Sequence, residues 1–411
     1  MERKKQSLSS RQYFVPFVLV TSLFFMWGFA RAILDVLNKH FQNELDISIS
    51  QSALIQVTTY LGYFLMAIPA GIFINRHGYR SGMVMGLSLF GLGSLLFIPC
   101  SAAGTFYAFL AALFVIGCGL VFLETSASPY VTELGPRSTA TSRLNLSQSF
   151  NGVGSMAATL VVGSFFFRSE GGSGNVVVPY TVMGIAVLLI ALAFSKVSLP
   201  EISYGGDGLH RDARGNIRRL FGNRSFVFGL SALLCYEIAE ISINSYFVNY
   251  VTGQGWMDDR MASVAITCAL ATFMAARFVG SWVMRCVAAE KLLLLCAAGT
   301  VTCVAVVLLD LGRMSMAALV CNYMFESIMF PTIFALALRD LGPMTKSASS
   351  LLMMTPVGGC VFLLMGIVAD TTGNMTLPFF IPLAGFAVVL AYALKLSAAL
   401  AKAGGTAENI G

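Results

Sequence analysis

The chain has 411 residues, of which 57% are hydrophobic and 11% are charged, and its mean hydropathy is +0.78. Soluble domains carry about 25% charged residues, so this composition excludes an ordinary soluble globular protein. The net charge of +6 follows from basic loops on one side of a membrane, and it gives no reason to expect a nucleic-acid partner.

Apolar stretches long enough to cross a bilayer recur along the whole chain. A transmembrane helix needs about 20 apolar residues. Twelve such spans are predicted, at residues 13–39, 51–75, 81–102, 105–132, 143–167, 177–197, 225–251, 262–288, 292–310, 314–338, 347–369 and 376–400. The charged segment 1–11 leads into a full-length span rather than a short signal-peptide core, which predicts a cytoplasmic tail. The predicted fold class is therefore an all-α polytopic membrane protein.

Lysine and arginine are distributed unequally between the two sides of the predicted membrane. Of the 26, four fall in loops assigned to the outside, two lie within spans, and the others lie on the inner side. The outer four are Lys39, Arg168, Arg260 and Arg313, and the two within spans are Arg31 and Arg277. Because positive loops face the cytoplasm, we expect a multi-pass protein of a bacterial inner membrane with both termini in the cytoplasm.

The longest polar segment, residues 198–223, divides the chain near its middle. It is rich in glycine and basic residues, which predicts a cytoplasmic linker. The linker would join an N-terminal six-helix bundle, residues 1–197, to a C-terminal six-helix bundle, residues 224–411.

The two halves share short patterns at corresponding spans. The pattern Gly-x4-Arg ends the second span from Gly71 and the eighth span from Gly280. The pattern Glu-x4-Pro occurs in the fourth span from Glu124 and in the tenth from Glu326. This repetition predicts a duplicated bundle with a binding site near mid-membrane, where the halves meet.

Five carboxylates lie inside the predicted spans: Asp35, Glu124, Glu237, Glu240 and Glu326. A charge at the centre of a bilayer costs roughly 2.5–3.5 kcal/mol even on the lenient insertion scales. Such residues persist when they face a water-filled path and bind protons, ions or substrate. Five of them in one chain predict a proton-coupled carrier.

The Glu-x4-Pro patterns also predict local defects in two helices. Proline releases the carbonyl four residues before it, which here belongs to Thr125 and to Ser327. Lipid cannot satisfy a released carbonyl, so each needs a protein or water partner. A hydrated cavity beside the carboxylates is the favoured interpretation, and a proline kink used only for packing is the alternative.

Charged residues on the first and seventh spans allow two interpretations each. Arg31 and Asp35 share one helix face. They form either an ion pair near the outer mouth or part of the transport site. Glu237 and Glu240 are adjacent on the seventh span and either share a proton or neutralise Arg277.

Amide side chains supply the substrate signal. Asn145, Gln148 and Asn151 follow one another along the fifth span, and Asn244 lies on the seventh. Amides donate and accept hydrogen bonds together, as a ring of sugar hydroxyls requires, whereas polar contacts between helices are the alternative. Trp27 and Tyr60 offer flat apolar faces for a pyranose ring.

Cysteine and histidine give no sign of a metal or a cofactor. The nine cysteines lie in or at the ends of apolar spans without a Cys-x-x-Cys pair, and the three histidines fall at span ends or in loops. We therefore expect buried free thiols, no disulfide framework, no metal site and no cofactor.

Four stretches of the chain resemble the L-fucose–proton symporter family of the major facilitator superfamily. They are LFFMWGFARAILD at residues 23–35, GLVFLETSASPYV at residues 119–131, RLNLSQSFN at residues 143–151 and FPTIF at residues 330–334. The resemblance covers nearly the whole chain. It implies two six-helix bundles that alternate access, with Asp35 and Glu124 in proton coupling and sugar binding and Gln148 in the sugar site.

The chain also departs from this family. The family pattern Asn-Asn-Leu-Asn-Asp is replaced by Arg31-Ala-Ile-Leu-Asp35, and Glu326 stands where a neutral residue is expected. In the loop after the second span, Asn75 replaces an aspartate, which weakens a charge-based inner gate. An arginine in the cavity suits an acidic sugar, or it holds Asp35.

The predicted function is proton-coupled import of a monosaccharide, with L-fucose or a related hexose as the first candidate. The predicted substrate-binding residues are Trp27, Arg31, Asp35, Glu124, Asn145, Gln148, Asn151, Glu240 and Asn244. The alternatives are a carrier of acidic or N-acetylated sugars and a proton-driven drug exporter. A drug exporter would favour a more apolar cavity than these amides indicate. An enzyme is not expected, because the chain has neither His-Glu-x-x-His nor Gly-x-Ser-x-Gly. The expected partners are a sugar, protons and the lipid bilayer, and the chain is expected to function as a monomer.

Overall fold

The computed structural model describes residues 13–45, 54–103, 105–166, 177–197, 199–200 and 213–408. Within these ranges the secondary structure is helical, which confirms the predicted all-α fold. The predicted site residues Arg31 and Asp35 lie outside the residues whose side chains are described, and the segment 1–11 lies outside the described chain.

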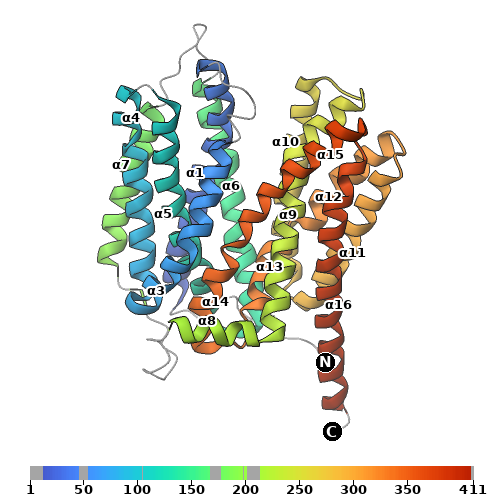
Figure 1. Ribbon diagram of the computed structural model, residues 1–411. Helices are drawn as coiled ribbons and strands as arrows, with labels where there is room; N and C mark the ends of the chain where they lie inside the picture. The colour runs from blue at the N-terminus through green and yellow to red at the C-terminus, as the bar shows by residue number, and fades with distance from the viewer. Residues whose placement is uncertain are drawn as a thin grey trace.

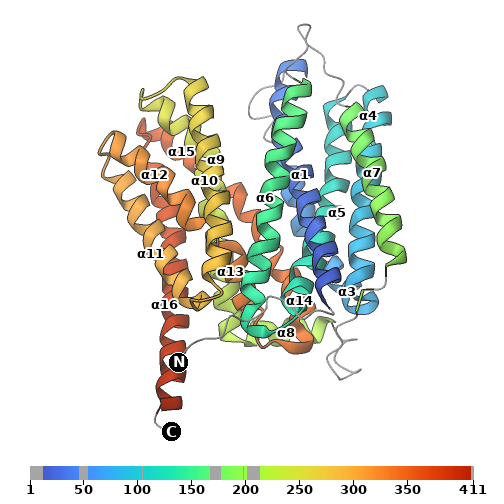
Figure 2. The same ribbon diagram turned by 180° about the vertical axis from the view of Figure 1, so that it is seen from behind.

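One group of helices comes from the N-terminal half of the chain (Figures 1 and 2). Its members are α1 (Phe14–Leu45), α3 (Leu54–Leu95), α4 (Phe97–Ala103), α5 (Phe106–Glu133), α6 (Ala140–Phe166) and α7 (Val177–Lys196). α3 covers most of the predicted spans 51–75 and 81–102, the second of which continues into α4, and it is kinked at Gly78, where φ is 83° and ψ is 169°. Glycine tolerates this positive φ, so Gly78 lets the chain turn between the two spans.

The second group comes from the C-terminal half and stands beside the first (Figure 1). Its members are α9 (Arg224–Gly253), α10 (Asp259–Val283), α11 (Ala289–Leu308), α12 (Arg313–Glu326), α13 (Met329–Ala337), α14 (Thr345–Leu352), α15 (Phe362–Thr372) and α16 (Phe380–Glu408). The short helix α8 (Ala213–Gly222), within the predicted linker, lies across the lower end of the molecule. Both views place α8 and α14 at this lower end.

Two predicted spans of the second group are broken helices. The span 314–338 becomes α12 and α13, which are separated at Ser327 and Ile328. The span 347–369 becomes α14, a 3₁₀ segment (Thr355–Val361) and α15. Broken helices are tolerated at membrane depth only where protein or water satisfies the freed backbone groups, so these breaks indicate places enclosed by protein or lining a cavity.

Close backbone contact joins α1 to α6. A Cβ atom at Gly28 would overlap the carbonyl oxygen of Asn151, and one at Gly154 would overlap that of Phe25. Small residues let membrane helices approach closely. The two glycines therefore fix the position of α1 against the helix that carries the predicted amides.

Apolar surface is exposed along the outside of the bundle. On α7, Val182, Ile185, Leu189 and Leu192 are each at least half exposed, at spacings of three or four residues. Among the described residues, nine helical runs are long and apolar enough to cross a membrane, and the longest, Val57–Ala103, covers most of two predicted spans. Exposed apolar stripes at helical spacing are typical of a surface that contacts lipid, which identifies a multi-pass membrane protein.

Candidate substrate and proton site

The contact between α1 and α6 positions Trp27 and Asn151. Trp27 is buried and packs on Phe24 with ring centroids 4.3 Å apart. The Nδ2 of Asn151 donates to the carbonyl oxygen of Phe24 at 3.2 Å, and the Oγ of Ser155 donates to that of Gly28 at 3.0 Å. The amide nitrogen of Asn151 therefore holds two helices together, although the side chain is only partly buried.

Asn145 joins the two groups of helices. It is fully buried, and its Nδ2 donates to the carbonyl oxygen of Thr141 at 3.0 Å and to the Oγ1 of Thr332, on α13, at 3.1 Å. These bonds fit the alternative interpretation for this residue, a polar contact between helices. Its Oδ1 has no hydrogen-bond partner among the described residues.

Gln148 differs from its two neighbouring amides. It is 6% exposed, and no hydrogen bond to its side-chain amide occurs within the described part of the chain. Its backbone carbonyl oxygen accepts a hydrogen bond from Nη1 of Arg277, on α10, at 3.4 Å. The side-chain amide is therefore available to a ligand, one helical turn from both Asn145 and Asn151.

Glu124 lies in the most enclosed part of α5. Every residue from Ile116 to Val131 is buried, and Glu124 itself is 6% exposed. α5 runs without interruption through Pro129, so its carboxylate is presented from a continuous helix surrounded by protein. Carboxylates enclosed at membrane depth are typical of proton, ion or substrate pathways.

Both carbonyls released by proline have a protein donor. The carbonyl oxygen of Thr125 accepts from the Oγ of Ser349, on α14, at 3.1 Å. That of Ser327 accepts from the Nε of Arg277 at 2.6 Å. The first bond connects the two groups of helices directly, and Arg277 connects them through its second bond, to Gln148.

The carboxylates of α9 lie near Arg277. Glu237 is buried, Glu240 is partly buried, and the charges of both lie within Coulombic range of the guanidinium. Asn244, one turn further along α9, has an enclosed Oδ1 without a hydrogen-bond partner among the described residues. The position of Glu237 and Glu240 is consistent with both predicted interpretations, a proton shared between them and neutralisation of Arg277.

Tyr60, expected to offer a flat face to a sugar, lines a small cavity between α3, α5 and the 3₁₀ segment. Its other lining residues are Thr59, Tyr63, Leu120 and Pro356, and its volume is about 20 Å³. This space suits a water molecule rather than a sugar.

Neutral hydrogen bonds close the lower end of the molecule between the two groups. Ser142 and Ser281 exchange bonds, since each hydroxyl donates to the other residue's carbonyl oxygen, at 2.8 and 3.0 Å. The Nδ2 of Asn75 donates to the Oγ of Ser347 at 2.8 Å. The predicted weakening of a charge-based gate at Asn75 therefore corresponds to an uncharged contact.

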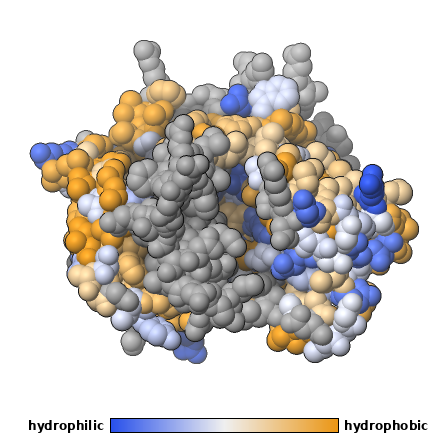
Figure 3. All heavy atoms as spheres, turned by 90° about the horizontal axis from the view of Figure 1, so that it is seen from above, coloured by the Kyte–Doolittle hydropathy of each residue, from blue (hydrophilic) through white to orange (hydrophobic). Residues whose placement is uncertain are grey.

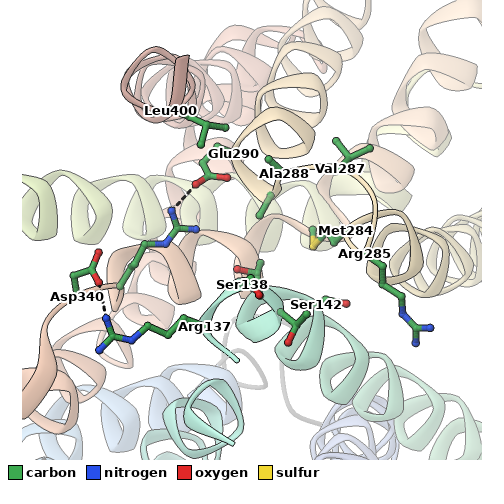
Figure 4. A pocket seen from close by; sticks show the side chains of 14 residues that line it. Arg137, Ser138, Ser142, Met284, Arg285, Val287, Ala288, Glu290, Asp340 and Leu400 are labelled. Carbon is green, nitrogen blue, oxygen red and sulfur yellow. Dashed lines mark hydrogen bonds and ion pairs between the residues drawn. The ribbon is translucent and has the colours of Figure 1, made fainter. Parts of the chain in front are cut away.

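A recess of about 330 Å³ opens beneath these contacts (Figure 4). It lies between the start of α6 and the ends of α10, α11, α13 and α16, and none of the predicted site residues lines it. Arg137 pairs with Asp340 across the groups at 3.1 Å, and Arg339 pairs with Glu290. The recess belongs to the closed end of the molecule rather than to the sugar site.

The opposite end is hollowed. In the view from above, Figure 3 shows a hollow beside the atoms drawn in grey, with hydrophilic residues inside it. Among the described residues, hydrogen bonds between the two groups therefore close the end that carries α8, and a hydrophilic hollow lies at the other end (Figure 3).

Comparison with known proteins decides the family. Residues 20–361 match the model of the Major Facilitator Superfamily. The chain belongs to this superfamily. It is 33% identical over 420 residues to the L-fucose-proton symporter of Escherichia coli (strain K12), with 95% of this chain and 94% of that protein covered. The predicted membership of the symporter's family is confirmed.

Other relatives have different sugars in their names. The chain is 33% identical over 404 residues to the glucose/galactose transporter of Brucella abortus, with 95% of this chain and 96% of that protein covered. The crystal structure of the superfamily transporter FucP in the outward conformation superposes with a TM-score of 0.84 at 32% identity, covering 93% of this chain and 99% of that one. The proton:xylose symporter XylE, at 14% identity and a TM-score of 0.74, shares the fold.

Sequence reasoning missed the donors that close the molecule. Ser349, Ser142 and Ser281 make their bonds across the two groups, and no motif marks them. The run of serines in residues 347–350 was the available signal, because polar residues repeated within a membrane span often bond a neighbouring helix.

We expect Ser349→Ala to weaken the closed end, because the carbonyl of Thr125 loses its donor. Loss of one hydrogen bond costs about 0.5–1.5 kcal/mol, a shift of roughly two- to tenfold in the equilibrium between closed and open ends. Distances between spin labels at the lower ends of α6 and α10, measured by double electron–electron resonance, report this shift.

Ser350→Ala is the matched control, since its hydroxyl bonds the carbonyl of Ser347 within the same helix, at 2.7 Å. It should leave the distances unchanged. Equal shifts in the two variants would contradict a role for Ser349 in closure.

Proposed function

We propose that this chain is a proton-coupled symporter that imports a monosaccharide by alternating access. Its relatives are named as L-fucose-proton symporters and glucose/galactose transporters. The observation that carries the proposal is that this fold holds a buried carboxylate, Glu124, and a buried amide, Gln148, whose side chain has no hydrogen-bond partner within the described part of the chain.

The moving parts in this proposal are the two bundles, residues 1–197 and 224–411, joined by the linker 198–223. Both termini lie in the cytoplasm of a bacterium, and the protein works as a monomer in the inner membrane. The closed end is then the cytoplasmic end, and the conformation is outward-facing. The outward conformation named for the structural relative FucP supports this assignment.

In the proposed cycle, Asp35 and Glu124 take up protons from outside while the sugar binds between the bundles. Gln148 provides a donor and an acceptor to adjacent hydroxyls, with Trp27, Arg31, Asn151, Glu240 and Asn244 around the sugar. Asn145, also predicted to bind the sugar, is assigned instead to the contact between the bundles through Thr332. Proton uptake neutralises negative charge on the carboxylates, and the sugar covers polar groups of the cavity, which together favour closure on the outer side. The bonds of Ser142, Asn75 and Ser349 then break as the cytoplasmic side opens.

The sugar itself is proposed as L-fucose or a related hexose. Relatives of equal identity have different sugars in their names, so overall identity does not select one. Arg31 favours the second candidate, an acidic or N-acetylated sugar, because a guanidinium binds a carboxylate well. Counterflow into proteoliposomes with a panel of labelled neutral, acidic and N-acetylated sugars tests both, and exchange of none of them would defeat the proposal.

Glu124→Gln should abolish uphill accumulation, because the amide cannot carry a proton. Exchange of sugar at equal concentrations on both sides of the membrane should persist, since the amide is isosteric with the protonated acid and is likewise neutral. Uptake driven by a pH gradient, compared with counterflow in the same vesicles, separates the two activities. Normal pH-driven accumulation in this variant would remove Glu124 from proton coupling.

Gln148→Ala should weaken sugar binding by about 1–3 kcal/mol, because a sugar hydroxyl is left unpaired. Isothermal titration measures the loss. Asn145→Ala is the matched control, since the bonds of that amide go to Thr141 and Thr332. The control should lower the melting temperature more than the affinity, and the reverse pattern would exchange the roles of the two amides.

Arg31→Ala distinguishes the two substrate classes. If Arg31 anchors a carboxylated sugar, affinity for that sugar should fall by about 2 kcal/mol or more, with little change in the pH profile. If it only pairs with Asp35, neutral sugars should still be transported with a shifted pH optimum. Unchanged substrate preference and pH profile would assign Arg31 to packing.

A further inference from the structure

Glu326, the last residue of α12, is a buried carboxylate that the proposed cycle does not use. Its exposed fraction is 0%, and its Oε2 accepts a hydrogen bond from the Nδ2 of Asn322 at 2.9 Å. Its Oε1 is enclosed and has no hydrogen-bond partner among the described residues. An ionised carboxylate held in this way would have one oxygen without solvation, and such buried charges are costly in proteins and in membranes.

Charged and titratable groups approach Glu326 from several helices. Those within Coulombic range are Tyr236 and Glu240 on α9, Arg277 on α10, Cys303 on α11 and Tyr323 on α12. Glu240 is a second acid, so negative charge on both residues would be repulsive. The hydroxyl of Tyr236 donates to the backbone carbonyl oxygen of Glu326, at 3.0 Å, and not to its carboxyl group.

Arg277 is the cation of this set, and its hydrogen bonds go to carbonyl oxygens. Its Nε donates to Ser327 at 2.6 Å and its Nη1 to Gln148 at 3.4 Å. Ser327 follows Glu326 directly in the chain, at the break between α12 and α13. The charge of Arg277 also lies within Coulombic range of the Glu326 carboxyl group, so the guanidinium stands near both groups.

We propose that Glu326 is a second proton-binding site of the carrier, neutral in this conformation and ionised when the closed end opens. Opening withdraws α6 and removes the Gln148 carbonyl from Arg277. The O–H bond of the carboxyl group then breaks, the proton passes to water on the cytoplasmic side, and the carboxylate accepts hydrogen bonds from Arg277. This inference deepens the proposed symport, on which its transport measurement rests.

Infrared difference spectroscopy of the purified full-length protein tests the protonation state directly. Glu326→Gln should remove a C=O stretching band of a neutral carboxylic acid. Glu290→Gln is the matched control, because Glu290 is also buried but pairs with Arg339, so it should remove carboxylate bands instead. Loss of carboxylate bands in Glu326→Gln would overturn the proposal. If that variant does not fold, Glu326→Asp should shift the acid band, and an unshifted band would overturn it equally.

Transport stoichiometry gives the second measurement. The slope of the logarithm of sugar accumulation against proton-motive force should be lower by one proton per sugar in Glu326→Gln than in the wild type. An equal slope would overturn the proposed role of Glu326 in the cycle. Failure of the wild type to accumulate any sugar would instead defeat the proposed symport, while the infrared result would still decide whether Glu326 is neutral.

Discussion

The arrangement depends on a constraint of the membrane interior, where a backbone carbonyl released by proline must find a hydrogen-bond donor. For Thr125 the donor is Ser349 of the opposite group of helices. For Ser327 it is Arg277, which also reaches the carbonyl of Gln148 across the interface. The helix defects and the contacts between the bundles are therefore one feature. Opening the closed end would expose these carbonyls, which then need another hydrogen-bond donor such as water.

The two halves use the same pattern differently. α5 stays continuous through Pro129, and its released carbonyl is bonded from the other bundle. The corresponding helix of the second half breaks at Ser327, and an arginine of the same bundle fills the gap. The duplicated pattern thus gives an enclosed, unbroken helix on one side and a broken helix with a buried cation on the other. The roles proposed for Glu124 and Glu326 in proton binding therefore need not be equivalent, because the surroundings of the two carboxyl groups differ.

Much of this could be predicted from the sequence, because it follows from local chemistry. The spans follow from hydropathy, and the need of Thr125 and Ser327 for partners follows from the proline positions alone. Which of the two helices would break could not be predicted, since Pro129 and Pro331 lie in the same pattern and only the tertiary donors differ. The roles of the amides were equally hidden: Asn145 and Gln148 lie on one face, yet only the position of Thr332 gives the first a protein partner. The parts assigned to Asp35 and Arg31 stay predictions.

The kind of contact at the closed end is itself informative about transport. The bonds of Ser142, Asn75 and Ser349 are neutral, and hydrogen bonds between membrane helices contribute roughly 0.6 kcal/mol each on average. The four bonds, of which two join Ser142 to Ser281, therefore total roughly 2 kcal/mol. This is less than the roughly 4 kcal/mol released when a ligand binds with millimolar affinity. A ligand shifts a conformational equilibrium only by its difference in affinity for the two states. The free energy of these contacts is small enough for the binding of a sugar to offset it. The charged pair at this end, Arg137 with Asp340, is largely exposed, and exposed pairs contribute little. Replacement of aspartate by Asn75 therefore suits a gate that must open in every cycle.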